Sequence, residues 1–331
     1  MIRVISVLVT VVIGVALVFG FTTTVRSETI TLKSAMFFPY TPRNAAWKRY
    51  VDWGAELKDR TNGGVTIKFV GGTRTIPWQD QIEAMKTGII DMSWTIPASY
   101  KTMVPEAMTF PVSEISTREE RKTGIYDIQN KLHHEHGLHL LGRLMAAGFV
   151  FYTNKLIKDP KKDFKGLKWG VTGTMWNPVC YALGITPAFV PPPEKYSAMQ
   201  RGVIDGMGIS RTGALALAIH EVAKYRIDHA FLKGGGAVVV MSLKAWKKLG
   251  KRLQDQLLAE FIKLEAEMDV LLPKLIKRER GIMIKKGVKM ITFSPADAEW
   301  YVNIAKEAKW KELEKLIPKY YTQFRKMLTK D

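Results

Sequence analysis

Residues 183–207, LGITPAFVPPPEKYSAMQRGVIDGM, predict a change from strand to helix and another from helix to strand within a short span. The apolar run at 186–190 predicts a strand, and 194–201 has the spacing of a short helix. Residues 203–210, VIDGMGIS, predict another strand with an Asp-Gly turn. A strand, a helix and a strand in this order are typical of a parallel sheet with covering helices.

The same alternation of strands and helices fills the chain before this stretch. Residues 28–36, ETITLKSAM, predict a first strand, and 42–61 carry apolar residues at helical spacing up to Asn62-Gly63-Gly64. Strands at 64–72 and 89–96, separated by a short helix at 79–87, complete a first α/β unit.

A second α/β unit is expected from the rest of the chain. The elements predicted there are a helix at 118–136, an extended segment at 138–154, a strand at 165–170, a helix at 176–183, a strand at 237–243, a long amphipathic helix at 253–277, a strand at 288–294 and helices from Pro295. We therefore predict two α/β lobes joined by several crossovers. Lobe I comprises 28–150 and about 237–280, and lobe II comprises 151–236 and about 281–331.

The charge balance of the chain is strongly basic. The net charge is +19, with 50 Lys and Arg against 31 Asp and Glu. Such an excess favours nucleic acid, an anionic membrane surface or small acidic ligands as partners. Nucleic acid usually requires the basic residues in one patch or module. Here they are spread along the chain, so a solvated basic surface is the simpler interpretation and no nucleic-acid partner is predicted.

The N-terminal segment predicts export. Met1 and Arg3 precede an apolar run at 4–21, and small and polar residues follow up to Glu28. This pattern is typical of a cleaved signal peptide at 1–27. The run of ~18 residues also reaches the lower limit for spanning a bilayer, so an uncleaved anchor is the alternative. Cys180 is the only cysteine, which excludes a disulfide framework and a lipoprotein anchor. We predict a protein of the Gram-negative periplasm.

Three stretches carry a resemblance to a known family. They are QIEAMKTGIIDMSW at 81–94, DFKGLKWGV at 163–171 and the segment at 183–207. In this order and spacing they resemble the periplasmic solute-binding proteins of TRAP transporters, the DctP family. The resemblance covers essentially the whole mature chain, and its most specific part is EKYSAMQRGVIDG following LGITP.

This resemblance implies a fold and a role. The fold is α/β, a two-lobed periplasmic binding protein of type II-like topology. It has central mixed sheets, hinge crossovers and a long helix, here 253–277, across both lobes. Such a protein closes on a small ligand, usually a carboxylate, and delivers it to the TRAP permease subunits in the membrane. No catalysis and no cofactor are expected, and a monomer is the default for such a shuttle.

The sequence departs from the family pattern where the ligand is expected. The family strand usually ends in an arginine that binds the carboxylate with two parallel hydrogen bonds, and Gly170 stands at that position. After the Asp-Gly turn the family usually has a Glu, then Asn or another residue, then Pro, and here Gly208, Ile209 and Ser210 stand at these positions. We therefore predict a monocarboxylate with an apolar or aromatic body. The alternatives are a receptor for a C4-dicarboxylate or another polar solute, and a ligand sensor for a membrane receptor.

Two arginines are candidates for the missing carboxylate contact. Arg211 directly follows the altered strand and could bind the ligand from the other side. Arg143, in LLGRLMA, lies near the expected lobe crossover, where family members often use a second arginine. A surface role is the alternative for Arg211, and the register around Arg143 is open.

Aromatic residues are expected at the ends of strands, where ligands of parallel sheets collect. Trp94 ends a strand of the first lobe, and Trp176 begins the helix after the Gly-rich turn; each offers a flat apolar face with one N–H donor. Phe38 and Tyr40 resemble the family's first-lobe cleft loop. Core packing is the alternative for Trp94 and Trp176, and it is the expectation for Trp169. Gly170, lacking a side chain, is expected to open room in the cleft.

Four histidines lie together in HHEHGLH, namely His133, His134, His136 and His139. Clustered histidines can bind zinc, so a periplasmic metal enzyme is a third hypothesis. No further ligand group is evident, and a solvated helix end is the expectation. The sequence contains no order of residues typical of a catalytic triad, and Cys180 lacks an evident activating partner.

Overall fold

The computed structural model describes residues 28–144, 147–191 and 194–330. The predicted signal peptide at 1–27 lies outside these described residues. Within them, none of the helices has the length and apolar character needed to cross a membrane.

Five strands form the first sheet, in the order β2-β1-β3-β10-β4. Strand β1 runs parallel to β2 and β3, whereas β10 is antiparallel to β3 and β4. The strands are β1 (Ile30–Met36), β2 (Val65–Gly71), β3 (Met92–Thr95), β4 (Leu138–Leu144) and β10 (Ala237–Ser242). Their crossover helices are α1 (Ala45–Arg60), whose first turn Asn44 caps, and α2 (Gln81–Lys86). This mixed sheet agrees with the predicted first α/β unit.

Six strands form the second sheet, in the order β11-β9-β5-β8-β6-β7. Strand β6 is parallel to β7 and β8, and β5 is antiparallel to β8 and β9. The strands are β5 (Phe149–Thr153), β6 (Lys168–Val171), β7 (Thr186–Phe189), β8 (Gly206–Ser210), β9 (Tyr225–Ile227) and β11 (Lys289–Ile291). The helices α5 (Asn177–Ala182) and α6 (Lys195–Gln200) connect the parallel strands. The stretch 183–207 thus forms the predicted strand, helix and following strand.

Two segments differ from the sequence-based expectation. The helix predicted at 118–136 is divided into α3 (Thr117–Lys122) and α4 (Ile125–Glu135), because Gly124 between them has φ 81°. The extended segment 138–154 supplies β4 to one sheet and β5 to the other. The chain therefore crosses between the lobes here, as the family resemblance implied.

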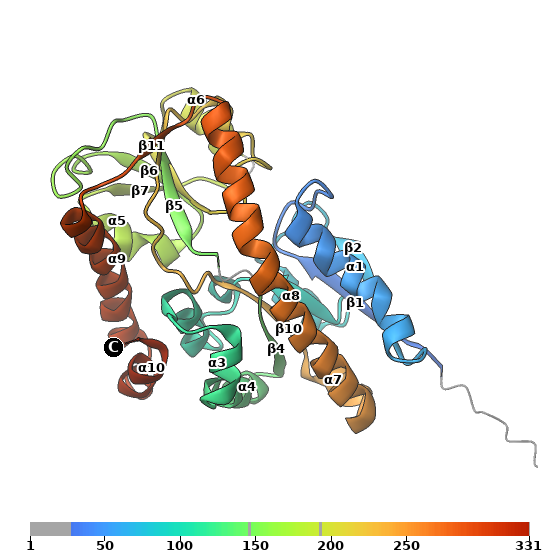
Figure 1. Cartoon of the computed structure of the whole chain (residues 1–331). Helices are drawn as coiled ribbons and strands as arrows, with labels where there is room; N and C mark the ends of the chain where they lie inside the picture. Colours follow the sequence, from blue (N-terminus) through green and yellow to red (C-terminus); the bar gives the residue numbers. More distant parts are fainter. Residues whose placement is uncertain (1–27, 145–146, 192–193, 331) are drawn as a thin grey trace, which may run out of the picture.

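The helix α8 (Gly250–Lys285) spans both lobes, as predicted, but extends beyond 253–277 at each end. Leu253 and Phe261 pack in the core beside the first sheet, and Met283 packs in the core beside the second. In Figure 1 this helix, in orange, runs diagonally past the two sheets from α7 (Leu243–Lys248) to α6. It therefore connects the two lobes along one rigid element.

The last helices, α9 (Pro295–Leu316) and α10 (Tyr321–Leu328), contact elements of both lobes. Helix α9 packs against α5 and against the 3-10 helix η2 (Pro105–Val112). The backbone N–H of Glu114 also donates to Leu328 O. The backbone N–H of Lys330 donates in turn to the Glu114 carboxylate. The proposed boundary at about 281 therefore stays a prediction. Further 3-10 turns are η1 (Pro97–Ser99), η3 (Thr174–Trp176) and η5 (Ile219–Glu221).

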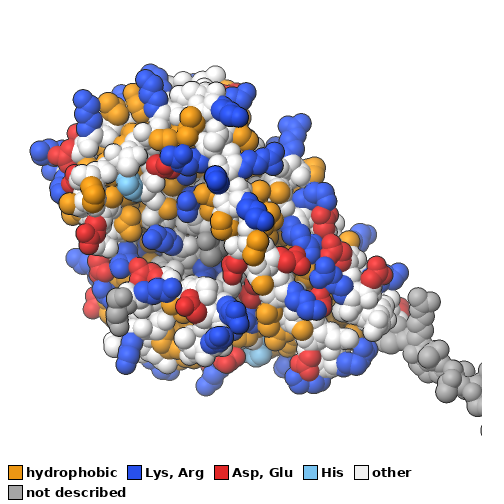
Figure 2. All heavy atoms as spheres, viewed as in Figure 1, with side chains coloured by type: hydrophobic (Ala, Val, Ile, Leu, Met, Phe, Trp, Pro, Cys, Tyr) orange, Lys and Arg blue, Asp and Glu red, His pale blue; other side chains and the backbone are white. Residues whose placement is uncertain are grey.

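The basic surface is dispersed on the face drawn in Figure 2. Lys and Arg side chains are scattered over both lobes there, with Asp and Glu among them. This distribution agrees with a solvated basic surface on that face.

Candidate functional site

An apolar cavity of about 160 Å³ lies between the two lobes. Its first-lobe wall comes from the segment after β1, from α1 and from the segment leading into β10. Its second-lobe wall comes from β5, the turn after β6, α6 and β8. The apolar side chains around it include Phe37, Phe38, Trp47, Ile96, Phe149, Met175, Trp176, Ile209 and Leu217. Among the described lining residues, Lys195 is the only one with a charged side chain.

The first-lobe wall is built on stacked aromatic rings. The chain after β1 is held by a hydrogen bond from Phe37 N to Trp94 O. The ring of Phe38 stacks on Trp47 with 4.8 Å between centroids, and it forms a T-shaped contact with Trp94 with 5.3 Å between centroids. Trp94 is fully buried behind Phe38 and does not line the cavity. The structure thus places Phe38 at the cavity and Trp94 in the layer that supports it.

The second-lobe wall is formed by the indole of Trp176 lying on strand β8. A Cβ atom added to Gly208 would lie 2.4 Å from Trp176 Cζ3, so only glycine allows the ring this close to the strand. The ring also contacts Phe149 edge-on at 4.8 Å. Ile209 and Ser210 continue the same wall. The space that a side chain at residue 208 would fill is therefore occupied by the ring of Trp176.

Lys195 was not recognised as a site residue from the sequence. It lies at the start of α6 with only 5% of its surface exposed, and its Nζ donates to Gly208 O over 3.3 Å. Burial lowers the pKa of its ammonium to about 8. A sequence signal existed, because Lys195, Ala198 and Met199 share the helical spacing of the buried face.

A second, larger cavity of about 580 Å³ adjoins the first and shares Pro39, Thr212 and Leu217 with it. Three arginines from distant parts of the chain line this outer cavity, namely Arg43, Arg74 and Arg278. Tyr40 is also here, with its ring edge-on to Phe69 at 4.9 Å. Tyr40 therefore lies in the outer cavity, whereas Phe38 lies in the inner one.

Glu279 of α8 holds the loop that lines both cavities. Its Oε1 accepts hydrogen bonds from the backbone N–H groups of Ala214 at 2.8 Å and Leu215 at 3.3 Å. Burial raises the pKa of this carboxyl to about 7. The same loop is joined to the first lobe, because Asn44 Nδ2 donates to Thr212 O over 3.2 Å. The loop thus carries a direct contact between the lobes.

The expectation that Gly170 opens room in the cleft is wrong. A Cβ at this position would lie 2.6 Å from Ile204 Cδ1 and 3.5 Å from Val190 Cβ. Packing of α6 and its flanking segments against the sheet has filled the space, and Gly170 is not among the described lining residues of the cavity. Trp169, on the opposite side of the strand, is fully buried, as expected.

Arg211 lies in a different hollow from the apolar cavity. Its neighbours there include Asp269, Pro273 and Arg280 of α8. Burial lowers the pKa of the Arg211 guanidinium, and the positive charge of Arg226 lowers it further. Its role as a ligand contact stays a prediction that the arrangement of the cavity does not favour.

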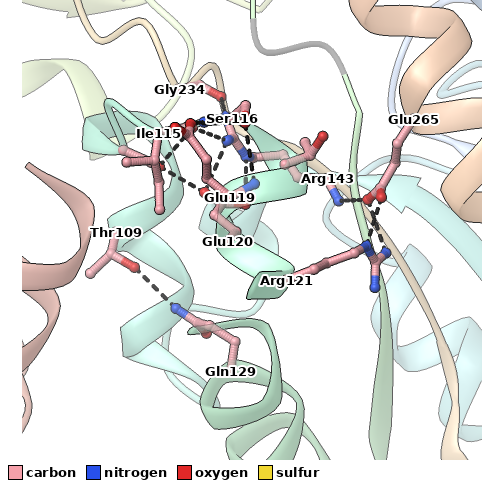
Figure 3. A network of polar contacts seen from close by, with 12 residues as sticks. Thr109, Ile115, Ser116, Glu119, Glu120, Arg121, Gln129, Arg143, Gly234 and Glu265 are labelled. Carbon is pink, nitrogen blue, oxygen red and sulfur yellow. Dashed lines mark hydrogen bonds and ion pairs between the residues drawn. The ribbon is translucent and has the colours of Figure 1, made fainter. Parts of the chain in front are cut away.

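Arg143 of β4 is buried in a polar network (Figure 3). Its Nη2 lies 2.9 Å from Glu120 Oε1 and donates to Ile115 O, while Nη1 donates to Gly234 O. Its backbone N–H donates to Glu265 of α8, which Arg121 binds over 2.7 Å. Arg143 is 2% exposed and absent from the described cavity lining. The network joins α3, β4 and α8 next to the glycines that lead into β10.

The expectation of a solvated histidine cluster is wrong for His133 and His139. The packed face of α4 buries His133, whose Nε2 lies 3.1 Å from Tyr100 OH. His139 stacks on Trp246 with 3.7 Å between ring centroids. Burial lowers the pKa of His133 to about 4 and that of His139 to about 3, so both rings are neutral at pH 7. Within the described ranges no group of three His, Cys, Asp or Glu side chains could hold a metal ion.

Two mixed α/β sheets, a cavity between them and one helix across both define a two-lobed binding protein. A family model described as bacterial extracellular solute-binding protein, family 7 (DctP), matches residues 40–315. The chain belongs to this family, the solute-binding proteins of TRAP transporters. This confirms the resemblance carried by 81–94, 163–171 and 183–207.

Known proteins agree with this assignment. A solute-binding protein of Albidiferax ferrireducens is 26% identical over 278 residues, which cover 79% of this chain and 79% of that relative. A Bordetella pertussis extracytoplasmic solute receptor binding pyroglutamic acid has a TM-score of 0.77 at 15% identity, covering 91% of this chain and 100% of that one. A TRAP periplasmic solute-binding protein from Rhodoferax ferrireducens with bound malonate has a TM-score of 0.73 at 21% identity, covering 90% and 98%. These two structures confirm the predicted fold.

Proposed function

We propose that this chain is the extracytoplasmic solute receptor of a TRAP-type importer and that its ligand is a small monocarboxylate with an apolar or aromatic body. The observation that carries this proposal is the interlobe cavity, whose walls are mainly aromatic and aliphatic side chains. Ligand pockets of this kind are apolar with a few polar groups that fix orientation. The family and the fold are those of receptors, which bind by closure of two lobes and perform no chemistry.

The size of the cavity supports a small, compact ligand body. A dry apolar cavity of about 150 Å³ is known to hold benzene, and this one measures about 160 Å³. Burial of apolar surface contributes about 25 cal/mol per Å², so a ring of this size gains several kcal/mol. A ligand of one ring or one branched aliphatic chain fits these limits.

The lining also favours one carboxylate over two. Similar structures hold both kinds of acid, since one binds pyroglutamic acid and another contains malonate. In this chain a second carboxylate would lie against rings such as Phe38 and Trp176. Burial of a charge without a partner is costly, which is why we prefer a monocarboxylate to a C4-dicarboxylate.

The outer cavity supports an acidic ligand. Arg43, Arg74 and Arg278 line it beside the loop that both cavities share. A cleft with clustered positive charge raises the local concentration of anions and the rate of association. We therefore propose that acids are attracted to the outer cavity and that their apolar bodies then enter the inner one.

The remaining parts of the proposal concern place and partners. We place the mature chain in the periplasm of a Gram-negative cell after removal of 1–27, as a monomer that presents both lobes to the TRAP permease subunits. Cys180 is buried, and burial raises the pKa of its thiol to about 12. It is therefore not a nucleophile at neutral pH, which agrees with a receptor that is no enzyme.

The experiment that tests this function is a ligand panel on the mature protein. Thermal shift followed by calorimetry would compare benzoate, phenylacetate, pyroglutamate and orotate with succinate, malate and malonate. We expect stabilisation by one or more of the first four and little by the diacids. Stabilisation by the diacids alone would reject the monocarboxylate, and stabilisation by no acid would reject the receptor for organic acids.

A further inference from the structure

The apolar cavity contains a single charged side chain among its described lining residues, and this is Lys195. Its side chain starts on α6 and ends against strand β8, where Nζ donates to Gly208 O over 3.3 Å. No carboxylate of the described residues forms an ion pair with it. A buried ammonium with one neutral partner is thus part of the wall of an apolar cavity.

This arrangement is unfavourable in the empty protein. An ammonium group has three N–H donors, and one carbonyl oxygen satisfies one of them. Removing a charge from water without a compensating partner costs free energy, and proteins usually pair such charges. The depressed pKa of Lys195 has the same cause, since burial is its only contribution. The other two N–H donors of the Lys195 ammonium can therefore bind an acceptor on a ligand.

The position of the ammonium points to where that acceptor comes from. Gly208 O, its one partner, belongs to the residue on which the ring of Trp176 lies. Both Lys195 and Trp176 line the cavity. A ligand whose ring contacts Trp176 can therefore carry a carboxylate to Lys195 at the same wall.

The other cations considered for this contact are engaged or placed elsewhere. Arg143 is ion-paired with Glu120 at 2.9 Å, and Arg211 lies in a separate hollow beside α8. The arginines of the outer cavity do not line the inner one. Lys195 is the charged group that remains at the inner cavity.

We infer that Lys195 is the residue that binds the ligand carboxylate, in place of the arginine that is missing at Gly170. A lysine is a point charge on a flexible chain and does not reproduce the two parallel hydrogen bonds of a guanidinium. The site therefore orients its ligand by the aromatic walls and by one ion pair. It favours acids whose single carboxylate lies at the edge of a flat or branched apolar body. This inference rests on the proposed function and names the charge at the same site.

The test uses the mature full-length protein and the variants Lys195→Met and Lys195→Arg. Lys251→Met, on the exposed face of α8, is the matched control because its side chain is 83% exposed. Calorimetry measures the affinity of each for benzoate, phenylacetate, pyroglutamate and orotate, and for benzamide as a neutral analogue of benzoate. Thermal unfolding without ligand is measured in parallel.

We expect Lys195→Met to weaken carboxylate binding by about ten- to hundredfold, as for a hydrogen-bonded charge pair. Binding of benzamide should change much less, and Lys195→Arg should retain part of the affinity. Without ligand, Lys195→Met should be at least as heat-stable as the wild type, because an uncompensated buried charge has been removed. A lysine with a purely structural role would instead lose stability in this variant.

The outcomes separate this inference from the proposed function. If the wild type binds one of the acids and Lys195→Met binds it equally well, the function stands and the role of Lys195 is rejected. If Lys195→Met loses both stability and affinity while Lys195→Arg regains neither, a structural role replaces the inference. If the wild type binds none of the acids, the proposed function fails and the inference fails with it.

Discussion

Arg143 and Glu120 form a buried ion pair, with 2.9 Å between Nη2 and Oε1, that closes a network between α3, β4 and α8. The guanidinium also donates to the carbonyl groups of Ile115 and Gly234. Gly234 directly precedes Gly235 and Gly236, which line the apolar cavity. The pair is therefore bonded to the segment that leads into the cavity wall.

Replacement of Arg143 by methionine should destabilise the fold. Glu120 would remain buried without its partner, and breaking a buried ion pair costs about 3–5 kcal/mol. Thermal and urea unfolding of Arg143→Met measure this loss, with Arg252→Met on exposed α8 surface as the control. The double variant Arg143→Met/Glu120→Met should recover part of the stability. Unchanged stability together with lost ligand binding would assign Arg143 to the ligand instead.

Gly208 should not tolerate a side chain. The added methyl group of Gly208→Ala would lie 2.4 Å from the ring of Trp176, so the ring must move into the cavity. Overpacking of this kind costs about 1–3 kcal/mol, and binding of ring-bearing acids should fall with it. Calorimetry and thermal unfolding measure both effects.

The matched control for this glycine is Gly281→Ala on α8, where no atom other than the adjoining backbone of the helix itself and its chain neighbours lies within 4 Å of the added Cβ. Alanine is favoured over glycine in a helix by about 1 kcal/mol. The control should therefore be as stable as the wild type or more so, with unchanged binding. Equal behaviour of the two variants would show that Trp176 does not depend on Gly208.

Much of the fold was predictable because each helix and strand follows from residues within its own segment. The strand at 186–190, the helix at 194–201 and the strand at 203–210 each follow from their own periodicity and turns, and all three are found. The family motifs then supplied the arrangement of the lobes. Positions of breaks were less predictable, since Gly124 divides a helical pattern that otherwise reads as continuous.

The site was less predictable because its contacts join distant residues. Nothing near Arg143 in the sequence indicates that Glu120 and Gly234 would surround it. The missing side chain of Gly170 predicts open space, but Ile204, which follows α6, fills that space. The sequence does not single out Lys195, because lysine side chains usually face solvent. Its helical spacing with Ala198 and Met199 nevertheless indicates the buried face of α6.

Glu279 should make stability depend on pH through the loop that it holds. Its carboxyl has a pKa of 4.5 when free and about 7 in the folded protein, so the folded state binds more protons between these values. The stabilising contribution is complete below pH 4.5 and is lost as the pH rises through 7. A shift of this size corresponds to roughly 3 kcal/mol.

The variant Glu279→Gln tests this dependence, because the amide oxygen can still accept from Ala214 and Leu215 but does not titrate. Unfolding measured from pH 4 to pH 8 should show a smaller fall in stability with pH than in the wild type. Glu135→Gln, at an exposed site, should keep the wild-type slope. A Glu279→Gln slope equal to that of the wild type would rule out this carboxyl as the source.

Ligand affinity should fall above about pH 8, and Lys195 should be the cause. The pKa of the Lys195 ammonium is about 8 in the folded protein, below the free value of 10.5. In the empty protein this ammonium therefore loses its proton as the pH rises through 8. A bound carboxylate stabilises the ammonium and raises its pKa, which means that binding takes up a proton above pH 8. Affinity should be level below that pH and fall by up to about tenfold per pH unit above it.

In Lys195→Arg the guanidinium stays charged, so its affinity for benzoate or pyroglutamate should stay level to about pH 10. A wild-type profile that is level across the same range would contradict a titrating ammonium at the site, because no other described lining residue carries a charge.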